Sequence, residues 1–138
     1  MSGLAAILAG HLEPGVYRWD AAFEPEDVAH AVTAAGWRFG YLDGWVAGSE
    51  AEFHQGIAAA LEFPDYYGAN LDALWDSLGE LAEPVVLLWD GWGPLARATP
   101  DRFGRILAVL RERSGAAATP FVVLMRGEGP EIGVSELR

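Results

Sequence analysis

FPDYYGANLDALWDSL, residues 63–78, is the most informative stretch of the sequence. Its second half has the apolar spacing of an amphipathic helix, at i, i+3, i+4 and i+7. The apolar positions that we expect to be buried are Leu71, Leu74, Trp75 and Leu78. Asn70 stands just before them, and asparagine is a favoured N-cap because its side-chain oxygen accepts from a free backbone N–H. The segment therefore predicts a short helix over residues 71–79.

The predicted outer face of this helix is acidic. Asp72, Asp76 and Glu80 follow one another at intervals of four residues, so they form a stripe along one side. Like charges at this spacing destabilise a helix by about 0.2–0.5 kcal/mol per pair. The helix dipole favours Asp72 in the first turn, but it offers nothing to the two acids farther along. The helix alone does not explain the stripe.

The surroundings of the stripe contain few opposite charges. No Lys or Arg occurs between Arg38 and Arg97, whereas ten carboxylates do. Tyr66 and Tyr67 precede the helix, and tyrosine is enriched at interface centres because it gives rigid contact area with a polar tip. Gly68 is expected to take a backbone conformation that other residues resist. The pattern is typical of a surface that binds a cationic partner, and an ordinary solvated helix face remains the alternative.

Outward from this segment, predicted strands alternate with predicted helices. Helices are expected over residues 2–10, 25–35, 50–62, 71–79 and 99–115. Strands are expected over residues 16–19, 37–42, 85–89 and 121–125, with at most a short one near 132–134. Two of these runs, 85–89 and 121–125, are continuously apolar, which is typical of parallel strands covered on both faces. The order predicts an α/β fold with a small, mainly parallel sheet packed with helices.

The composition excludes several classes of protein. The 138 residues are 51% hydrophobic, enough for one compact core. Twenty carboxylates face nine arginines, and this net charge of −11 argues against nucleic acid or an anionic membrane as a partner. The absence of cysteine excludes disulfides and thiolate metal sites. No targeting segment or membrane span is evident, so we expect a cytoplasmic protein.

The histidines give no reason to expect a metal or a cofactor. His11, His30 and His54 lack the spacing of a ligand set. His54 is expected at the surface or at the edge of the core. Asp90-Gly91-Trp92-Gly93 is too short for a phosphate-binding loop and has no lysine, so we interpret it as a plain connection from a strand to a helix.

Residues 63–78 closely resemble the hallmark segment of the barstar family, whose members are intracellular inhibitors of ribonucleases. A weaker resemblance extends from about residue 37 to residue 125. The resemblance implies a barstar-like domain over residues 37–138. Residues 1–36 have no counterpart in the family, and we expect them to form an N-terminal strand–helix extension that either extends the sheet or forms a separate surface.

The resemblance also implies which residues meet a partner, because the loop tyrosine and the helix acids of the family enter a nuclease active site. The matching positions are Tyr66, Asn70, Asp72, Trp75 and Asp76. Asp76 is implied as the main contact, its carboxylate standing where a substrate phosphate would lie. Glu112 matches a further acidic contact, and Glu80 continues the stripe. The family's function would be a one-to-one complex with a basic, secreted-type microbial ribonuclease, without catalysis or a cofactor.

Other functions stay open at this point. An immunity or adaptor protein for another basic partner, such as a deoxyribonuclease or a toxin domain, would suit the same acidic face. A protein that keeps the fold without any nuclease partner is a further alternative. Asp72 and Asp76 could form a carboxylate pair for glycoside hydrolysis, but they share one exposed helix face and do not flank a cleft.

Overall fold

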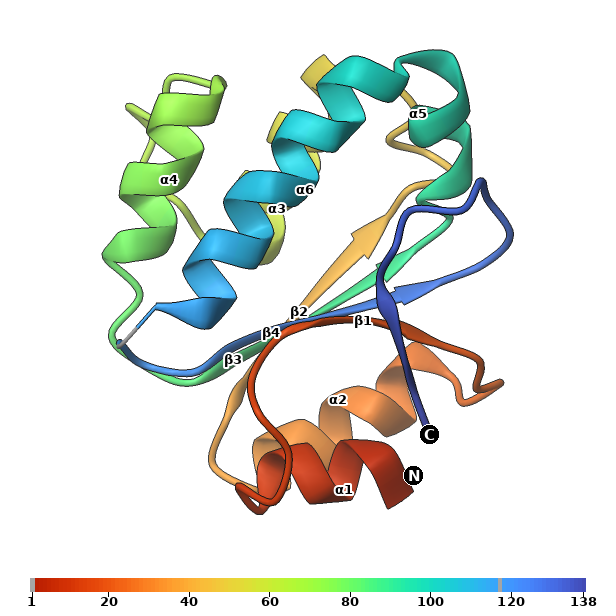
Figure 1. Ribbon diagram of the computed structural model, residues 1–138. Helices are drawn as coiled ribbons and strands as arrows, with labels where there is room; N and C mark the ends of the chain where they lie inside the picture. The colour runs from red at the N-terminus through yellow and green to blue at the C-terminus, as the bar shows by residue number, and fades with distance from the viewer. Residues whose placement is uncertain (1, 117) are drawn as a thin grey trace.

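The computed structural model of the protein describes residues 2–116 and 118–138, and a five-stranded sheet lies at its centre (Figure 1). The strands are β1 (Val16–Trp19), β2 (Arg38–Asp43), β3 (Val85–Asp90), β4 (Phe121–Arg126) and β5 (Ser135–Leu137). Their order across the sheet is β2-β3-β4-β1-β5, and every pairing is parallel. The predicted α/β class is confirmed, and the sheet is more uniformly parallel than expected.

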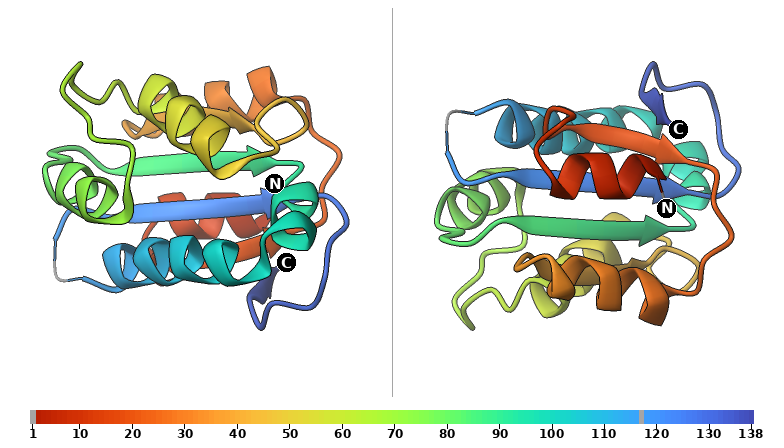
Figure 2. Two further views of the ribbon diagram at one scale, coloured as in Figure 1. Left: turned by 90° about the horizontal axis from the view of Figure 1, so that it is seen from above. Right: turned by 90° about the horizontal axis from the view of Figure 1, so that it is seen from below.

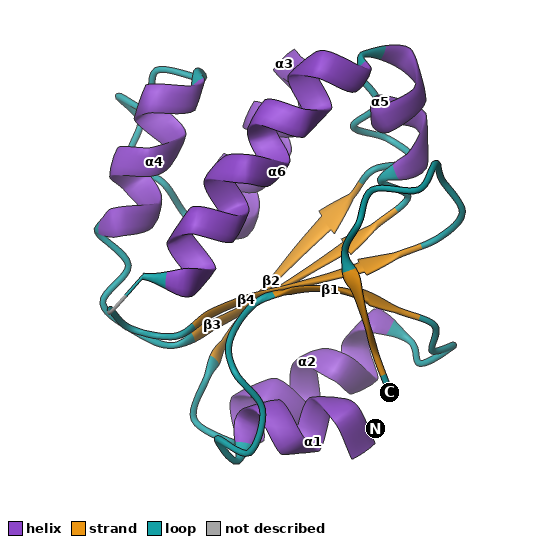
Figure 3. Ribbon diagram, viewed as in Figure 1, coloured by secondary structure: helices purple, strands orange, loops and turns teal. Residues whose placement is uncertain are grey.

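Helices cover both faces of this sheet (Figure 3). The helices of the described residues are α1 (Ser2–Leu8), α2 (Pro25–Ala34), α3 (Glu50–Ala60), α4 (Leu71–Gly79), α5 (Gly93–Ala98) and α6 (Pro100–Gly115). The last four lie on one face, whereas α1 and α2 lie on the other, as the views from above and below show (Figure 2). None of them combines the length and the apolar character that crossing a membrane would require.

The two central strands explain why both faces need a cover. Residues 85–89 and 121–125 are buried throughout, so their side chains alternate between two apolar clusters. On the face covered by α3 to α6, the helices pack with Val85, Leu87 and Trp89. Val86 and Leu88 pack with residues of α1 and α2. Continuous apolar runs therefore predicted central parallel strands correctly.

The N-terminal extension joins the same sheet. Strand β1 pairs with β4 through Val16↔Val123 and with β5 through Trp19↔Leu137. It therefore lies between two strands from the end of the chain. The alternative in which residues 16–19 extend the sheet is the one that the structure adopts.

Two local expectations differ from the structure. The last strand is Ser135–Leu137 and not the run near residues 132–134, because pairing with β1 selects it. Helix α5 was not expected; it begins at Gly93, where the predicted connection from a strand to a helix ends. Gly91, Gly93 and Pro94 are loop signals in the sequence, but a proline in the first turn of a helix is compatible with that turn.

The strand register places charged residues together at the carboxyl end of the sheet. Asp43, Asp90 and Arg126 occupy matching positions on β2, β3 and β4. The Arg126 guanidinium donates to both oxygens of Asp90, at 2.6 and 2.8 Å. Tyr41 donates its hydroxyl proton to the same carboxylate, and burial together with this bond raises the pKa of Tyr41 to about 12. Helix α4 lies at the opposite end, where the chain enters β3 (Figure 1).

Candidate functional site

Helix α4 begins where the sequence predicts. The side-chain oxygen of Asn70 accepts the backbone N–H of Ala73 at 2.8 Å, which is an N-cap bond. Leu74 and Leu78 are fully buried in the apolar cluster between the sheet and helices α3 to α6. These two leucines fix which side of α4 turns inward, and they leave the stripe of acids on the outside.

The predicted burial of Trp75 is wrong. The side chain is 41% exposed and does not lie in the core. Each helical residue turns by about 100°, so Trp75 lies beside Asp72 and Asp76 once Leu74 and Leu78 define the inner side. Ser77 is partly buried.

The exposed side of the helix, here called the α4 face, therefore combines an indole with carboxylates. Its members are Asp72, Trp75, Asp76 and Glu80. Within the described part of the chain, none of the three acids forms an ion pair. A helix surface with three unpaired carboxylates around an exposed tryptophan can bind a cationic group by charge and by cation–π contact.

The two tyrosines before α4 point in different directions. Tyr66 is 82% exposed. Tyr67 is half-buried, and its ring packs on Phe63 and His54 with centroid distances of 5.0 and 5.8 Å. Tyr67 therefore anchors the loop on the core, and Tyr66 is left free beside the helix.

His54 is also placed differently from the expectation. It is fully buried on α3, and its Nδ1 lies 2.6 Å from the Tyr67 hydroxyl. Burial lowers the pKa of His54, although the carboxylate of Glu50, 3.7 Å from Nε2, opposes this shift. The sequence signal that could have found its burial is that His54 stands three residues before the apolar Ile57, on the same side of the helix.

The turn into α4 uses a different residue from the one expected. Gly68 does not have a positive φ, so its predicted role is wrong; Ala69 has the left-handed conformation, with φ 52°. Near the end of α3, Glu62 has φ 54°. Non-glycine residues in this region are uncommon and cost of order 1–3 kcal/mol. The loop from residue 62 to residue 69 is therefore held by its contacts, and the Tyr67 anchor is one of them.

The end of α4 is fixed by a buried arginine from α6. Arg113 donates from Nε to the carbonyl of Leu78 at 2.7 Å and from Nη1 to the carbonyl of Thr119 at 2.9 Å. The carbonyls at a helix C-terminus carry partial negative charge, so a guanidinium there is favourable. Because Arg113 is turned inward, it leaves the carboxylates of the α4 face unneutralised.

Glu112 is exposed on α6, the helix packed against α4. Its neighbours are both engaged elsewhere, because Arg111 donates to the carbonyl of Gly133 and Arg113 donates to Leu78. Glu112 is thus free to meet a partner, but on a different helix from the α4 face. Tyr66 and Asn70 lie in the loop and at the cap that precede this face.

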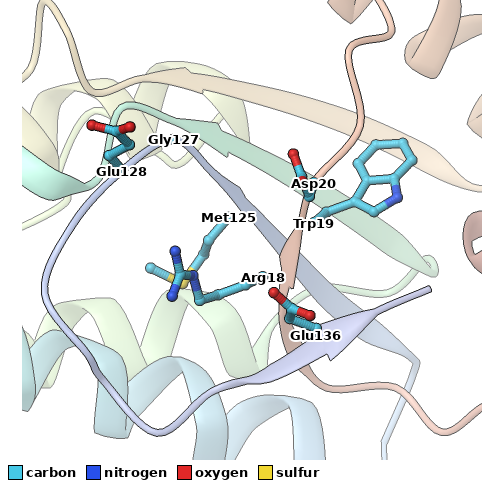
Figure 4. Close-up of a pocket in the computed structure, with 7 residues that line it drawn as sticks. All are labelled: Arg18, Trp19, Asp20, Met125, Gly127, Glu128 and Glu136. Carbon is cyan, nitrogen blue, oxygen red and sulfur yellow. The ribbon is translucent and has the colours of Figure 1, made fainter.

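One further concave surface lies away from α4. A pocket of about 350 Å³ opens at the carboxyl ends of β1 and β4, where Arg18 lies among carboxylates (Figure 4). Its other lining residues are Trp19, Asp20, Met125, Gly127, Glu128 and Glu136. None of the predicted site residues lines it. Among residues 2–116 and 118–138, no group of three His, Cys, Asp or Glu side chains is arranged to hold a metal ion.

Comparison with known proteins gives a family match and a short relative. The family model described as Barstar (barnase inhibitor) matches residues 37–126. A curated protein of Bacillus subtilis (strain 168), named putative ribonuclease inhibitor YrdF, is 64% identical over 25 residues. That stretch is 18% of this chain and 28% of the relative's length.

Solved structures share the fold at low identity. The ORC2 protein of Aeropyrum pernix has a TM-score of 0.64 and 14% identity, over 93% of this chain and 39% of its own. Cdc6p from Pyrobaculum aerophilum has a TM-score of 0.57 and 17% identity, over 90% of this chain and 37% of its own. At these identities the likeness concerns the fold alone.

The matched region runs from Trp37, just before β2, to the end of β4. It therefore contains α4, the loop with both tyrosines, and helix α6, which packs against α4. It covers well over half of the chain and agrees with the extent of the resemblance in the sequence. The chain belongs to the barstar family.

Proposed function

We propose that this protein inhibits a basic microbial ribonuclease by forming a one-to-one complex in which the α4 face and Tyr66 close the active site of the enzyme. One observation carries the proposal: on one side of a well-anchored helix, three carboxylates that form no ion pair with any described residue surround an exposed tryptophan. The family match and the name of the short relative support the same role. The inhibitor performs no catalysis and acts by occupying the site, in the cytoplasm.

Asp76 is the proposed centre of this interface. A ribonuclease active site is built to hold a phosphate, so its cationic side chains can accept a fixed carboxylate in the same place. Asp76 lies in the middle of α4, one turn from both Asp72 and Glu80. Leu74 and Leu78 hold that helix in the core, so the carboxylate is positioned before binding.

The other predicted contacts surround this centre. Tyr66 and Trp75 supply aromatic area, which is common among residues that dominate interface energies. Asn70 uses its oxygen for the helix cap and donates one N–H of its amide to the carbonyl of Gly68, which leaves the second N–H for a partner. Glu80 at the end of α4 and Glu112 on α6 would be peripheral acids that improve charge complementarity.

The net charge of −11 would act at longer range. A basic enzyme is attracted by this field before contact, and the attraction raises the association rate. Screening by salt shortens the reach of the field, so the benefit decreases as ionic strength rises.

The test is a titration of the protein into a panel of basic microbial ribonucleases, with residual RNA cleavage as the readout. We expect activity to be lost at a one-to-one ratio for at least one enzyme. Asp76→Asn should then weaken inhibition strongly, since removing one partner of a buried charge pair costs about 2–5 kcal/mol in such interfaces.

Glu26→Gln is the matched control, because it removes the same charge from α2 on the other side of the sheet. If Asp76→Asn and Glu26→Gln weaken inhibition equally, the proposed role of Asp76 is contradicted. If no ribonuclease is inhibited, the proposal fails, and a deoxyribonuclease or a basic toxin domain becomes the better candidate partner.

A further inference from the structure

The outer edge of strand β2 presents unused backbone groups. The N–H of Arg38 donates to Pro84 and the N–H of Gly44 donates to Asp90, so the even-numbered residues of this strand face β3. In a parallel pairing the alternate residues face the other way. The N–H and C=O of Phe39 and Tyr41 therefore point off the sheet, because among the described strands β2 lies at the edge and pairs with β3 alone.

A groove of about 570 Å³ runs along this edge, between β2 and α3. Helix α3 contributes one side to it, with Glu52, Gln55, Gly56, Ala59 and Ala60. These residues recur at helical spacing and three of them are small, so the helix leaves room beside the strand. Leu42, Val46 and Ala47 make the lining largely apolar.

Two large apolar side chains are exposed at the end of this groove. Trp45 and Val46 follow β2 after Gly44, and they are 63% and 74% exposed. Val46 lines the groove, and the Trp45 ring packs against Gly91 at the carboxyl end of the sheet. Adjacent exposed apolar groups next to a groove are typical of a protein interaction surface.

The charge of the groove selects the chemistry of an occupant. Asp43 and Glu52 line it, and no basic residue of the described chain does. The nearest arginine along β2 is Arg38, which is engaged with the carbonyl of Leu61 and the carboxylate of Glu62. A basic segment is therefore complementary to the groove, and a second copy of this chain, with a charge of −11, is not.

We infer that the groove between β2 and α3 binds an extended basic peptide segment of a partner protein, which adds to the sheet as a sixth strand. The backbone of Phe39 and Tyr41 would hold the segment by hydrogen bonds, and alternate side chains would enter the apolar groove. Strand addition of this kind uses main-chain bonds for affinity and side-chain pockets for specificity. The site shares no residue with the α4 face, so it does not depend on the proposed inhibitor function.

The probe for the test is the peptide acetyl-Lys-Val-Lys-Val-Lys-Val-Lys-amide, titrated into the isotope-labelled full chain. We expect saturable changes in the amide resonances of Phe39 and Tyr41, with slower hydrogen exchange at both. The same peptide with Glu in place of Lys should not bind. Ala59→Arg, which fills the groove and adds a positive charge, should weaken binding of the basic peptide by at least about tenfold.

Two variants serve as controls. Ala108→Arg places the same change on an exposed position of α6, and it should leave binding unchanged. Asp76→Asn should also leave it unchanged, which separates the groove from general attraction to the α4 face. The inference is overturned if binding does not saturate, if Ala59→Arg has no effect, or if the amide changes are confined to α4. Self-association that Ala59→Arg abolishes would assign the groove to a second copy and would also overturn it.

Discussion

The hydroxyl of Tyr67 lies 2.6 Å from Nδ1 of the buried His54. Burial raises the pKa of Tyr67 to about 12, so the hydroxyl keeps its proton at neutral pH. This contact joins the loop before α4 to the inner side of α3. It separates the roles of two adjacent tyrosines, because Tyr67 is held by the core while Tyr66 stays exposed.

Tyr67→Phe should destabilise the fold. The change removes the hydroxyl and leaves Nδ1 of His54 without its partner in a buried position, which costs about 1–3 kcal/mol. Equilibrium denaturation by urea measures this loss. An unchanged free energy of unfolding would show that the hydrogen bond does not anchor the loop.

Tyr66→Ala should have the opposite profile. The side chain is exposed, so its removal should change the free energy of unfolding by less than about 0.5 kcal/mol. It should weaken the complex with an inhibited ribonuclease, because a rigid aromatic contact is lost. Measuring the inhibition constant and the free energy of unfolding of Tyr66→Ala and of Tyr67→Phe compares the two roles. Tyr66 has no role in the interface if its removal leaves inhibition intact.

Trp75 and Leu74 give a second pair of neighbours with different roles. Leu74→Ala removes a fully buried side chain and should destabilise the protein by about 2–5 kcal/mol. Trp75→Ala removes a partly exposed ring from the α4 face, so it should reduce inhibition more than stability. Thermal unfolding and inhibition assays on both variants test this. If Trp75→Ala lowered stability as much as Leu74→Ala, Trp75 would have to be a core residue.

The existence of α4 was predictable from its own residues, but its rotation was not. The Asn70 cap and the leucine spacing are local signals, and both are confirmed. The apolar arc of the sequence also includes Trp75. Packing against α6 turns the helix so that Leu74 and Leu78 face inward and Trp75 does not. A helix's rotation about its own axis is decided by its neighbours, which its sequence does not specify.

The same distinction explains the other differences. Continuous apolar runs predicted β3 and β4, because a strand buried on both faces has no polar alternation. Strand β5 was misplaced because its position depends on pairing with β1, more than 115 residues earlier in the chain. Burial of His54 depends on Tyr67, which belongs to a later segment. The charged α4 face was predictable in composition, whereas Arg113, which fixes its end, gave no sequence signal.

His54 should make stability depend on pH between neutral and mildly acidic conditions. Burial lowers its pKa in the folded protein below the ordinary value of 6.5, and the nearby carboxylate of Glu50 only partly opposes this. As the pH falls through 6.5, the unfolded chain takes up a proton that the folded protein does not. Unfolding is then favoured, and the free energy of unfolding should decrease from pH 7.5 towards the lowered pKa of the folded state.

The contribution of Glu50 falls in a different range, because its hydrogen bonds with Arg102 lower its pKa from 4.5 and its stabilisation is lost only at more acidic pH. His54→Gln should therefore flatten the pH dependence above pH 5 while keeping a polar partner for Tyr67. His30→Gln, at an exposed position of α2, is the matched control and should keep the slope of the unchanged protein. Denaturation at several pH values between 5 and 7.5 measures all three. Equal slopes for the unchanged protein and His54→Gln would mean that another group is responsible. A histidine that is buried and neutral in the folded protein must lower the free energy of unfolding once the pH is low enough to protonate it in the unfolded chain.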